Sequence, residues 1–439
     1  MKKIFLSCGF ALLIIANVTT SKAQDATQKN GLLKTAHAFI NAYNTGDTAK
    51  YHQFLSQNQI ASTEIPRLLG SFRNTFNSIG KIEAKDFTYL SPTTIKVAAQ
   101  ENKYEFWWLF TINTDQNQQF KSRTVMPLPF PAIGLQSGKI ADAKFEKELD
   151  DYITQKLGAS FAGNVWISEN GKWKFQRSYG KDHKGLANTA ATAFGLASVG
   201  KMFTAISVLQ LKDQKKLKLE DQVGLYLPEL KNKKVAALTL AQLLTHTSGM
   251  GDFFESPLFA KLKDSLTTPK NFMPFFEADE LNFEPGKEWR YSNSGFSLLS
   301  LIIEKVSGSS FKDYVAQHIF KVAKMENSVV GLGAGGGTST SGDMMLFLNS
   351  LEKNQLLSKA TTDEFLNYTV DVNENYGYGT EHHRLGSEHI VGHSGSVEEE
   401  NNEINFYPNL KYKVIILSNT PPPIAHYVSN KIKGMLIRK

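Results

Sequence analysis

The chain has 439 residues, of which 41% are hydrophobic and 21% are charged, and its formal net charge at pH 7 is +7. This length allows two or three domains with sizeable cores, and the composition is that of an ordinary globular protein. The mild positive charge includes no basic block, which argues against a nucleic acid partner. Cys8 is the only cysteine, which excludes a disulfide framework and a cluster of thiolate metal ligands.

Residues 1–23 are typical of a secretory signal peptide. Lys2 and Lys3 precede an apolar run, and the small residues of SKA at 21–23 suit a cleavage site. The alternative is a membrane anchor, but the apolar run is short for a spanning helix. Cleavage after Ala23 removes three lysines, no acidic residue and the cysteine, and so lowers the net charge from +7 to +4. We therefore expect a periplasmic or secreted protein with no membrane span after cleavage.

Residues 24–126 are expected to form a small accessory α+β domain. Apolar side chains recur at helical spacing in 31–44, and further helical patches follow at 48–57 and 64–78. Residues 84–126 then have the composition of strands, as in YEFWWLFTI. Three helices followed by about four strands indicate an α+β arrangement. This element order resembles the nuclear-transport-factor-like fold, a resemblance that implies a fold and no particular activity.

A proline-containing linker is expected at 127–141. Three prolines in MPLPFPAIG, at 126–134, cannot continue a sheet and favour an extended connection. The larger domain, 142–439, is expected to begin with a helix near 142–157. Two alternating runs follow and are joined by Asn170-Gly171, which is a strong hairpin signal.

Strand patterns return only near the end of the chain, in EHIVGHSG, EINFYP and KYKVIILSN, before a terminal helix. Strands at both ends of the larger domain, with helices between them, predict one antiparallel sheet with an inserted helical cluster. The glycine-rich stretch GLGAGGGTSTSG, at 331–342, is interpreted as a flexible loop.

The stretch FGLASVGKMFTA, at 194–205, places Ser198 three residues before Lys201 in a segment with the pattern of a buried helix. Residues i and i+3 share one face of a helix. A lysine desolvated in a pocket loses its proton near neutral pH and can accept a proton from serine. The pair alone is weak, because S-x-x-K occurs often by chance, and a solvated helix face is the alternative.

A later segment supplies partners for this pair. In FEPGKEWRYSNSGFSLL, Tyr291 and Asn293 lie between a Pro-Gly turn and an apolar helix. A tyrosine can relay a proton to a leaving group, and an asparagine amide can hold a substrate carbonyl or orient a lysine.

The segment VGHSGS places His393 at the close of an apolar strand. The small residues Ser394, Gly395 and Ser396 would let a substrate backbone lie along the strand edge. The backbone N–H groups of Ser396 and Ser198 together could form an oxyanion hole.

The motifs SVGK, YSN and HSG, in this order, resemble those of the serine β-lactamase and penicillin-binding-protein superfamily. The stretches KLKLEDQVGLYLPEL and LTLAQLLTHTSGM are similar to its class C-like serine hydrolases. The resemblance covers about residues 145–439. It implies a β-lactamase/transpeptidase-like domain, with an antiparallel sheet, flanking helices and an all-α cluster. It also implies hydrolysis of a small ester, D-amino-acid peptide or β-lactam through an acyl-serine intermediate, without a metal or organic cofactor.

Carried over by motif, the resemblance implies that Ser198 is the nucleophile, Lys201 its base and Tyr291 the proton shuttle to the leaving group. Asn293 would orient the substrate, and His393 would be the electropositive or hydrogen-bonding residue of the closing strand. The partner would be a small-molecule or peptide substrate. The alternative function is a penicillin-recognising sensor or binding module with little turnover.

The sequence departs from the family pattern after HSG, where SVEEENNEINFYP places Glu398, Glu399 and Glu400 in a row. A solvated turn is one interpretation, since charge runs usually face water. The other is that one glutamate points into the cleft and favours a substrate bearing an ammonium group.

Three histidines outside the motifs are given structural interpretations. His246 in LTHTSG is expected to have a packing role. His382 and His383 are neighbours on a strand and point to opposite faces, which argues against a shared metal ion.

Overall fold

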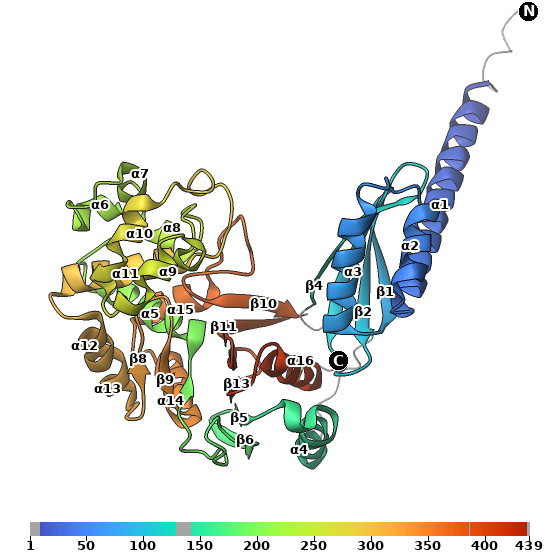
Figure 1. Cartoon of the computed structure of the whole chain (residues 1–439). Helices are drawn as coiled ribbons and strands as arrows, with labels where there is room; N and C mark the ends of the chain where they lie inside the picture. Colours follow the sequence, from blue (N-terminus) through green and yellow to red (C-terminus); the bar gives the residue numbers. More distant parts are fainter. Residues whose placement is uncertain (1–8, 129–141, 386, 437–439) are drawn as a thin grey trace, which may run out of the picture. The chain divides into compact units, whose positions relative to one another are not determined.

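The computed structural model describes residues 9–128, 142–385 and 387–436 (Figure 1). The chain divides into two compact units, Met1–Leu135 and Gln136–Lys439. Residues 1–8 of the predicted signal peptide and 129–141 of the predicted linker lie outside the described residues. Within the part that is described, no helix combines the length and the apolar character that crossing a membrane requires.

The first unit contains three helices and a four-stranded antiparallel sheet. The helices are α1 (Gly9–Asn44), α2 (Thr48–Gln57) and α3 (Ile65–Ile79). The strands pair in chain order and are β1 (Ile82–Ser91), β2 (Thr94–Glu101), β3 (Trp107–Thr114) and β4 (Phe120–Pro127). Their core is rich in aromatic rings, among them Phe39, Tyr43, Phe72 and Phe110. The predicted small α+β fold of this unit is confirmed.

The second unit is built on a six-stranded antiparallel sheet with the order β10-β11-β12-β13-β5-β6. The strands are β5 (Gly163–Glu169), β6 (Lys172–Tyr179), β10 (Glu381–Leu385), β11 (Glu388–Val397), β12 (Glu400–Tyr407) and β13 (Tyr412–Ser418). β5 pairs with β13, so strands from the two ends of the unit lie side by side. Asn170 and Gly171 have φ of 51° and 77° and make the tight β5–β6 turn that their sequence predicts.

Two layers of helices cover this sheet (Figure 1). α16 (Ile424–Leu436) packs on β12 and β13, and α4 (Asp142–Asp151) packs beside it on β6. The other layer is the inserted helical cluster, whose centre is α5 (Lys201–Asp213) against α11 (Asn293–Ser307). Both are buried over most of their length, as their apolar sequences require.

Shorter helices complete the cluster: α6 (Val223–Tyr226), α7 (Lys233–Ala236), α8 (Leu240–Leu244), α9 (Phe259–Leu262), α10 (Met273–Ala278), α12 (Phe311–Val315), α13 (Lys321–Ala323), α14 (Ser341–Glu352) and α15 (Lys359–Asn367). The predicted antiparallel sheet with an inserted helical cluster is confirmed.

The glycine-rich stretch 331–342 differs from the flexible loop expected from its composition. Its residues Gly337–Ser339 form β9, which pairs with β7 (Phe194–Gly195) and β8 (Val329–Val330). Gly335 has φ of 136°, and a Cβ at this position would lie 2.5 Å from the Ala197 carbonyl oxygen. Glycine is therefore needed here for close backbone contact with the turn that carries Ser198.

Candidate active site

Ser198 lies in a short 3-10 turn, η3 (Ala197–Gly200), directly before α5. Ala197 has φ of 46°, which is uncommon for a residue with a side chain. Its carbonyl oxygen accepts a hydrogen bond of 2.8 Å from the Gly336 N–H. The glycine-rich segment thus holds the turn in place, and Ser198 lines a cavity of about 660 Å³.

Lys201 is fully buried, and its Nζ lies 3.3 Å from Ser198 Oγ. Nζ donates hydrogen bonds to Asn293 Oδ1, at 2.7 Å, and to the Ala334 carbonyl oxygen. Burial lowers the pKa of Lys201 to about 7, since desolvation disfavours the charged ammonium. A neutral amine has two N–H groups and one lone pair. Because the two oxygens take both N–H groups, the lone pair is left for the Ser198 hydroxyl.

Asp252 fixes the orientation of the Asn293 amide. Its Oδ2 accepts hydrogen bonds from Asn293 Nδ2, at 2.7 Å, and from the Asn293 backbone N–H, at 3.1 Å. A carboxylate can only accept, so the amide must turn its NH₂ group to Asp252 and its oxygen to Lys201. Asp252 and Glu381 both favour the ammonium form of Lys201 and oppose the effect of burial on its pKa.

Tyr291 shares the cavity with Ser198, and Lys201 Nζ lies 4.7 Å from the centre of its ring. Burial raises the pKa of Tyr291 above its ordinary value, whereas hydrogen bonding with the Ser198 side chain lowers it. The phenol therefore stays protonated at neutral pH. In this state it can donate a proton to a leaving group and cannot act as a base.

A chain of buried hydrogen bonds joins the YSN and HSG motifs. The Ser292 N–H donates to His246 Nδ1 at 3.1 Å, and His246 Nε2 lies 3.0 Å from the Tyr376 hydroxyl. Tyr376 also lies 3.0 Å from His393 Nε2, and His393 Nδ1 lies 2.6 Å from the Ser394 carbonyl oxygen.

The two backbone ends of this chain fix its direction. A backbone N–H can only donate and a carbonyl oxygen can only accept, so every link runs from Ser292 towards Ser394. His246 then donates from Nε2 to Tyr376, and Tyr376 donates to His393. Both imidazoles are neutral in this arrangement, in agreement with burial, which lowers the pKa of His246 and of His393.

The small residues of β11 have different surroundings, and only Ser396 lines the cavity that contains Ser198. Gly395 passes so close to the backbone of Leu196 that an added Cβ would overlap the Leu196 carbonyl oxygen. The Ser394 hydroxyl and N–H donate to Glu381, at 2.7 and 3.1 Å. Ser396 lines the cavity together with Ser198. His393, which was predicted to contact the substrate, is 2% exposed and is not part of the cavity wall. Its Nε2 accepts a hydrogen bond from the Tyr376 hydroxyl instead.

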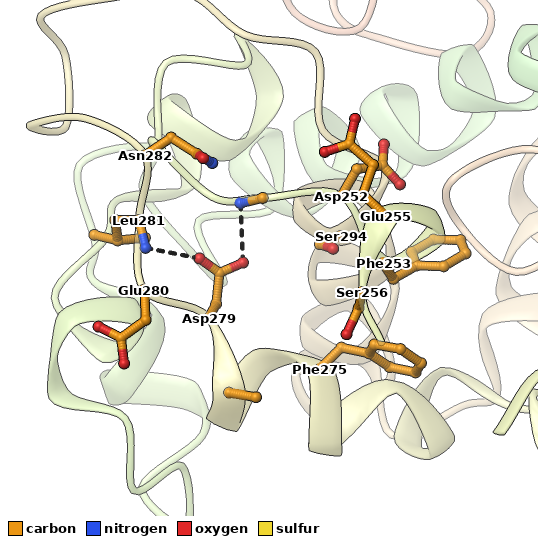
Figure 2. Close-up of a pocket in the computed structure, with 12 residues that line it drawn as sticks. Asp252, Phe253, Glu255, Ser256, Phe275, Asp279, Glu280, Leu281, Asn282 and Ser294 are labelled. Atoms are coloured by element: carbon orange, nitrogen blue, oxygen red, sulfur yellow. Dashed lines mark hydrogen bonds between the residues drawn. The ribbon is translucent and has the colours of Figure 1, made fainter. Parts of the chain in front are cut away.

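A second cavity, of about 220 Å³, is lined by Asp252, Phe253 and Asp279, among others (Figure 2). Phe253 also lines the cavity that contains Ser198. Asp279 accepts hydrogen bonds there from the Gly251 N–H, at 3.0 Å, and from the Leu281 N–H, at 2.9 Å. The Gly251 carbonyl oxygen in turn accepts from the Ser292 hydroxyl at 2.7 Å. These bonds fix the segment that presents Asp252 to Asn293.

The structure therefore brings together Ser198 and Lys201 of the SVGK motif with Tyr291 and Asn293 of the YSN motif. It adds Asp252, Glu381 and Tyr376, which the sequence analysis missed. Asp252 follows the stretch LTHTSGM by two residues, so this family-like stretch offered a signal. Tyr376 has no motif around it. 

His382 and His383 lie on β10 and have different surroundings. His382 Nδ1 lies 2.7 Å from His389 Nε2, and His383 is half-buried and lies near Lys433 and Glu403. Among the described residues, no group of three or more His, Cys, Asp or Glu side chains is placed to hold a metal ion.

The fold and these motifs define a serine-hydrolase-like domain, and comparison with known proteins identifies its family. Residues 145–437 match the family described as Beta-lactamase, which is two thirds of the chain, and the chain belongs to this family. PbpX of Bacillus subtilis (strain 168), which is named as a penicillin-binding protein, is 30% identical over 218 residues. This match covers 49% of the chain and 50% of PbpX, so the chain spans half the length of that relative.

Solved structures share the fold of this domain. The octameric penicillin-binding protein homologue from Pyrococcus abyssi is 24% identical, with a TM-score of 0.60, and the match covers 67% of this chain and 77% of the other. The D-amino acid amidase from Ochrobactrum anthropi SV3, in complex with L-phenylalanine amide, is 20% identical with a TM-score of 0.57. That match covers 67% of this chain and 97% of the amidase.

Proposed function

We propose that the protein is an exported serine hydrolase that forms an acyl-serine intermediate and hydrolyses an ester or amide. One observation carries this proposal: Lys201 is buried beside Ser198 with a pKa of about 7, and two fixed acceptors engage its N–H groups. An amine held in this way has its lone pair free to accept the Ser198 proton.

In the acylation step, Ser198 Oγ attacks the substrate carbonyl carbon while Lys201 takes the hydroxyl proton. The negative oxygen of the tetrahedral intermediate accepts hydrogen bonds from the backbone N–H groups of Ser198 and Ser396. The bond to the leaving group then breaks, and Tyr291 donates the proton that the leaving group needs. The ammonium of Lys201 returns a proton to the phenolate, which leaves the acyl-serine with a neutral amine.

In the deacylation step, the amine of Lys201 accepts a proton from water, and the resulting hydroxide attacks the acyl carbonyl. The intermediate collapses, Ser198 leaves as an alkoxide and recovers its proton from Lys201. The net reaction consumes one water and releases an acid and an alcohol or amine.

The substrate classes under this proposal are a small ester, a D-amino-acid amide or peptide, and a β-lactam. The relatives named as penicillin-binding proteins and as a D-amino acid amidase support this range. The cavity walls include Phe253, Phe254, Phe272 and Leu332, which favour a substrate with an apolar part. Export rests on the signal-like residues 1–23.

Labelling of Ser198 tests the proposal. A fluorophosphonate should add one phosphonyl group to the wild-type protein, as seen by intact mass spectrometry, and none to Ser198→Ala. Peptide mapping should place the adduct on Ser198. Equal labelling of the variant would contradict the assignment of the nucleophile.

Labelled penicillin, or an activated ester such as 4-nitrophenyl acetate, separates hydrolysis from the sensor alternative. A hydrolase releases many product molecules per protein and loses its acyl adduct within minutes. A sensor or binding module retains the adduct and releases only one equivalent of leaving group.

A further inference from the structure

The three consecutive glutamates after HSG have different surroundings. Glu398 is exposed. Glu399 is also exposed and forms an ion pair of 3.5 Å with His183. Glu400 is half-buried and lines the same cavity as Ser198 and Tyr291. The acidic run is therefore a surface feature at its first two positions and part of the candidate active site at the third.

The fold fixes the carboxylate of Glu400. The residue begins β12 and pairs with Val397 across the β11–β12 turn. Its carboxylate packs directly on Gly195, where an added Cβ would overlap both carboxylate oxygens. The Gly195 carbonyl oxygen is itself held by Asn402 Nδ2 at 2.8 Å. Gly195 precedes Ser198 by three residues, so this contact holds the carboxylate close to the nucleophilic turn.

The charge of Glu400 is poorly compensated by the protein. The cavity that it lines has several apolar side chains in its wall, among them Phe253, Phe254 and Leu332. Burial raises the pKa of Glu400, and His183 is the group that opposes this effect. No lysine or arginine among the described residues forms an ion pair with it. A half-buried carboxylate in such a wall gains from a cation that a ligand brings.

We propose that Glu400 determines substrate specificity by binding a primary ammonium group of the substrate, while the apolar part of the substrate packs on the phenylalanines of the cavity. This inference rests on the proposed hydrolase function and narrows its substrate class. The same aromatic rings favour a cation near their faces, which adds to the attraction of the carboxylate. A partly screened charge pair of this kind should change specificity about tenfold.

Two pairs of substrates that differ only in the ammonium group test this inference. In the acyl group, D-alanyl and isobutyryl esters of one phenol exchange an ammonium for a methyl group. The second pair, 3-(aminomethyl)phenyl acetate and 3-ethylphenyl acetate, makes the same exchange of an ammonium for a methyl group in the leaving group. The quantity measured is the ratio of kcat/KM for the charged ester to that for its neutral partner. Division by the ratio of the uncatalysed rates in buffer removes the intrinsic reactivity of each ester.

The corrected ratio should exceed one for at least one pair in the wild-type protein, and Glu400→Gln should lower that ratio about tenfold. Glu398→Gln and Glu399→Gln are matched controls, because they remove the same charge from the same turn outside the cavity wall. A corrected wild-type ratio of one for both pairs would overturn the inference without any variant. An equal fall in all three variants would overturn it too, because it would indicate a general electrostatic effect.

Fluorophosphonate labelling of Ser198 keeps this test separate from that of the hydrolase itself. If Ser198 is labelled and the neutral esters are hydrolysed, but the charged esters have no advantage, only the role of Glu400 is refuted. Absence of Ser198 labelling refutes the proposed hydrolase. If Glu400→Gln folds poorly, the wild-type ratio at low and high salt decides, because an ammonium–carboxylate contact weakens as salt screens it.

Discussion

The Tyr376 hydroxyl lies 3.0 Å from His393 Nε2, inside a buried chain of hydrogen bonds that ends at the backbone of Ser394. The other end of the chain is the Ser292 N–H in the YSN motif. A single phenol therefore couples the loop that presents Tyr291 and Asn293 to the strand that presents Ser396. Its role is positioning, since Tyr376 reaches the candidate catalytic groups only through other residues.

Tyr376→Phe should loosen this coupling. The substitution leaves the Nε2 atoms of His246 and His393 without their partner, which costs about 1–3 kcal/mol of unfolding free energy. We expect kcat to fall more than KM rises, because the two motifs lose their mutual alignment. Tyr378→Phe is the control, since Tyr378 is also buried but stacks on Tyr368. Denaturant unfolding and steady-state kinetics with 4-nitrophenyl acetate measure both effects; a loss of stability with unchanged kcat would limit Tyr376 to a structural role.

The contrast between Ser198 and Tyr376 explains which parts of the site were predictable. Ser198 and Lys201 are three residues apart, so helical geometry alone brings them to one face, and the motif is visible in the sequence. Tyr376 and His246 are 130 residues apart, and their contact depends on how the segment after α15 packs against α8. No local pattern encodes such a contact.

The fold was predictable where local chemistry determines it. Asn170-Gly171 fixes a hairpin because both residues adopt positive φ at low cost. The loop predicted at 331–342 is present at 331–336, whereas Gly337–Ser339 form β9 and Ser341 begins α14. Glycine permits both irregular loops and close packing, so the sequence alone does not reveal the packing of Gly335 on the backbone of Ala197. Glu400 is a similar case, because its two acidic neighbours are exposed and the run looks uniform in the sequence.

Asp252→Asn should move the pH profile in a known direction. Lys201 has to be neutral to act as a base, so kcat/KM should rise with pH through about 7 in the wild-type protein. The Asp252 carboxylate favours the ammonium form, and its removal should lower the pKa of Lys201 further. The rising limb then moves to lower pH. Glu255→Gln, three residues away on an exposed side chain that pairs with Arg290, should leave the limb in place. A limb that moves to higher pH in Asp252→Asn would argue against Lys201 as the titrating base.

Tyr291→Phe should lower kcat by about 10²–10⁴-fold for substrates whose leaving group needs a proton. The phenol is protonated at neutral pH because burial raises its pKa, so it can serve as the acid. An ester with a 4-nitrophenolate leaving group needs no proton and should lose much less activity than an alkyl ester or an amide. Equal losses for both leaving groups would show that Tyr291 acts on another step.

Gly395→Ala should separate β11 from the turn that carries Ser198. A methyl group at this position overlaps the Leu196 carbonyl oxygen, so the strand or the turn must move. Overpacking of this kind costs about 1–3 kcal/mol, and we expect slower fluorophosphonate labelling of Ser198. In Gly342→Ala, the new methyl group meets Trp166 at the ordinary contact distance of 3.6 Å, and labelling should match the wild-type rate. Wild-type labelling of Gly395→Ala would mean that the approach of β11 is not needed for reaction.

A fragment that begins at Ala132 should fold and react without the first unit. The second unit, Gln136–Lys439, has its own six-stranded sheet and a continuous apolar core around α5 and α11. All groups assigned to the reaction, from Ser198 to Ser396, belong to this unit. We therefore expect a cooperative unfolding transition and a fluorophosphonate labelling rate within about twofold of that of the full chain, since a domain with its own core can fold alone. The Ser198→Ala version of the fragment is the control for labelling. A soluble fragment that labels much more slowly than the full chain would instead assign the first unit a direct part in forming the active site.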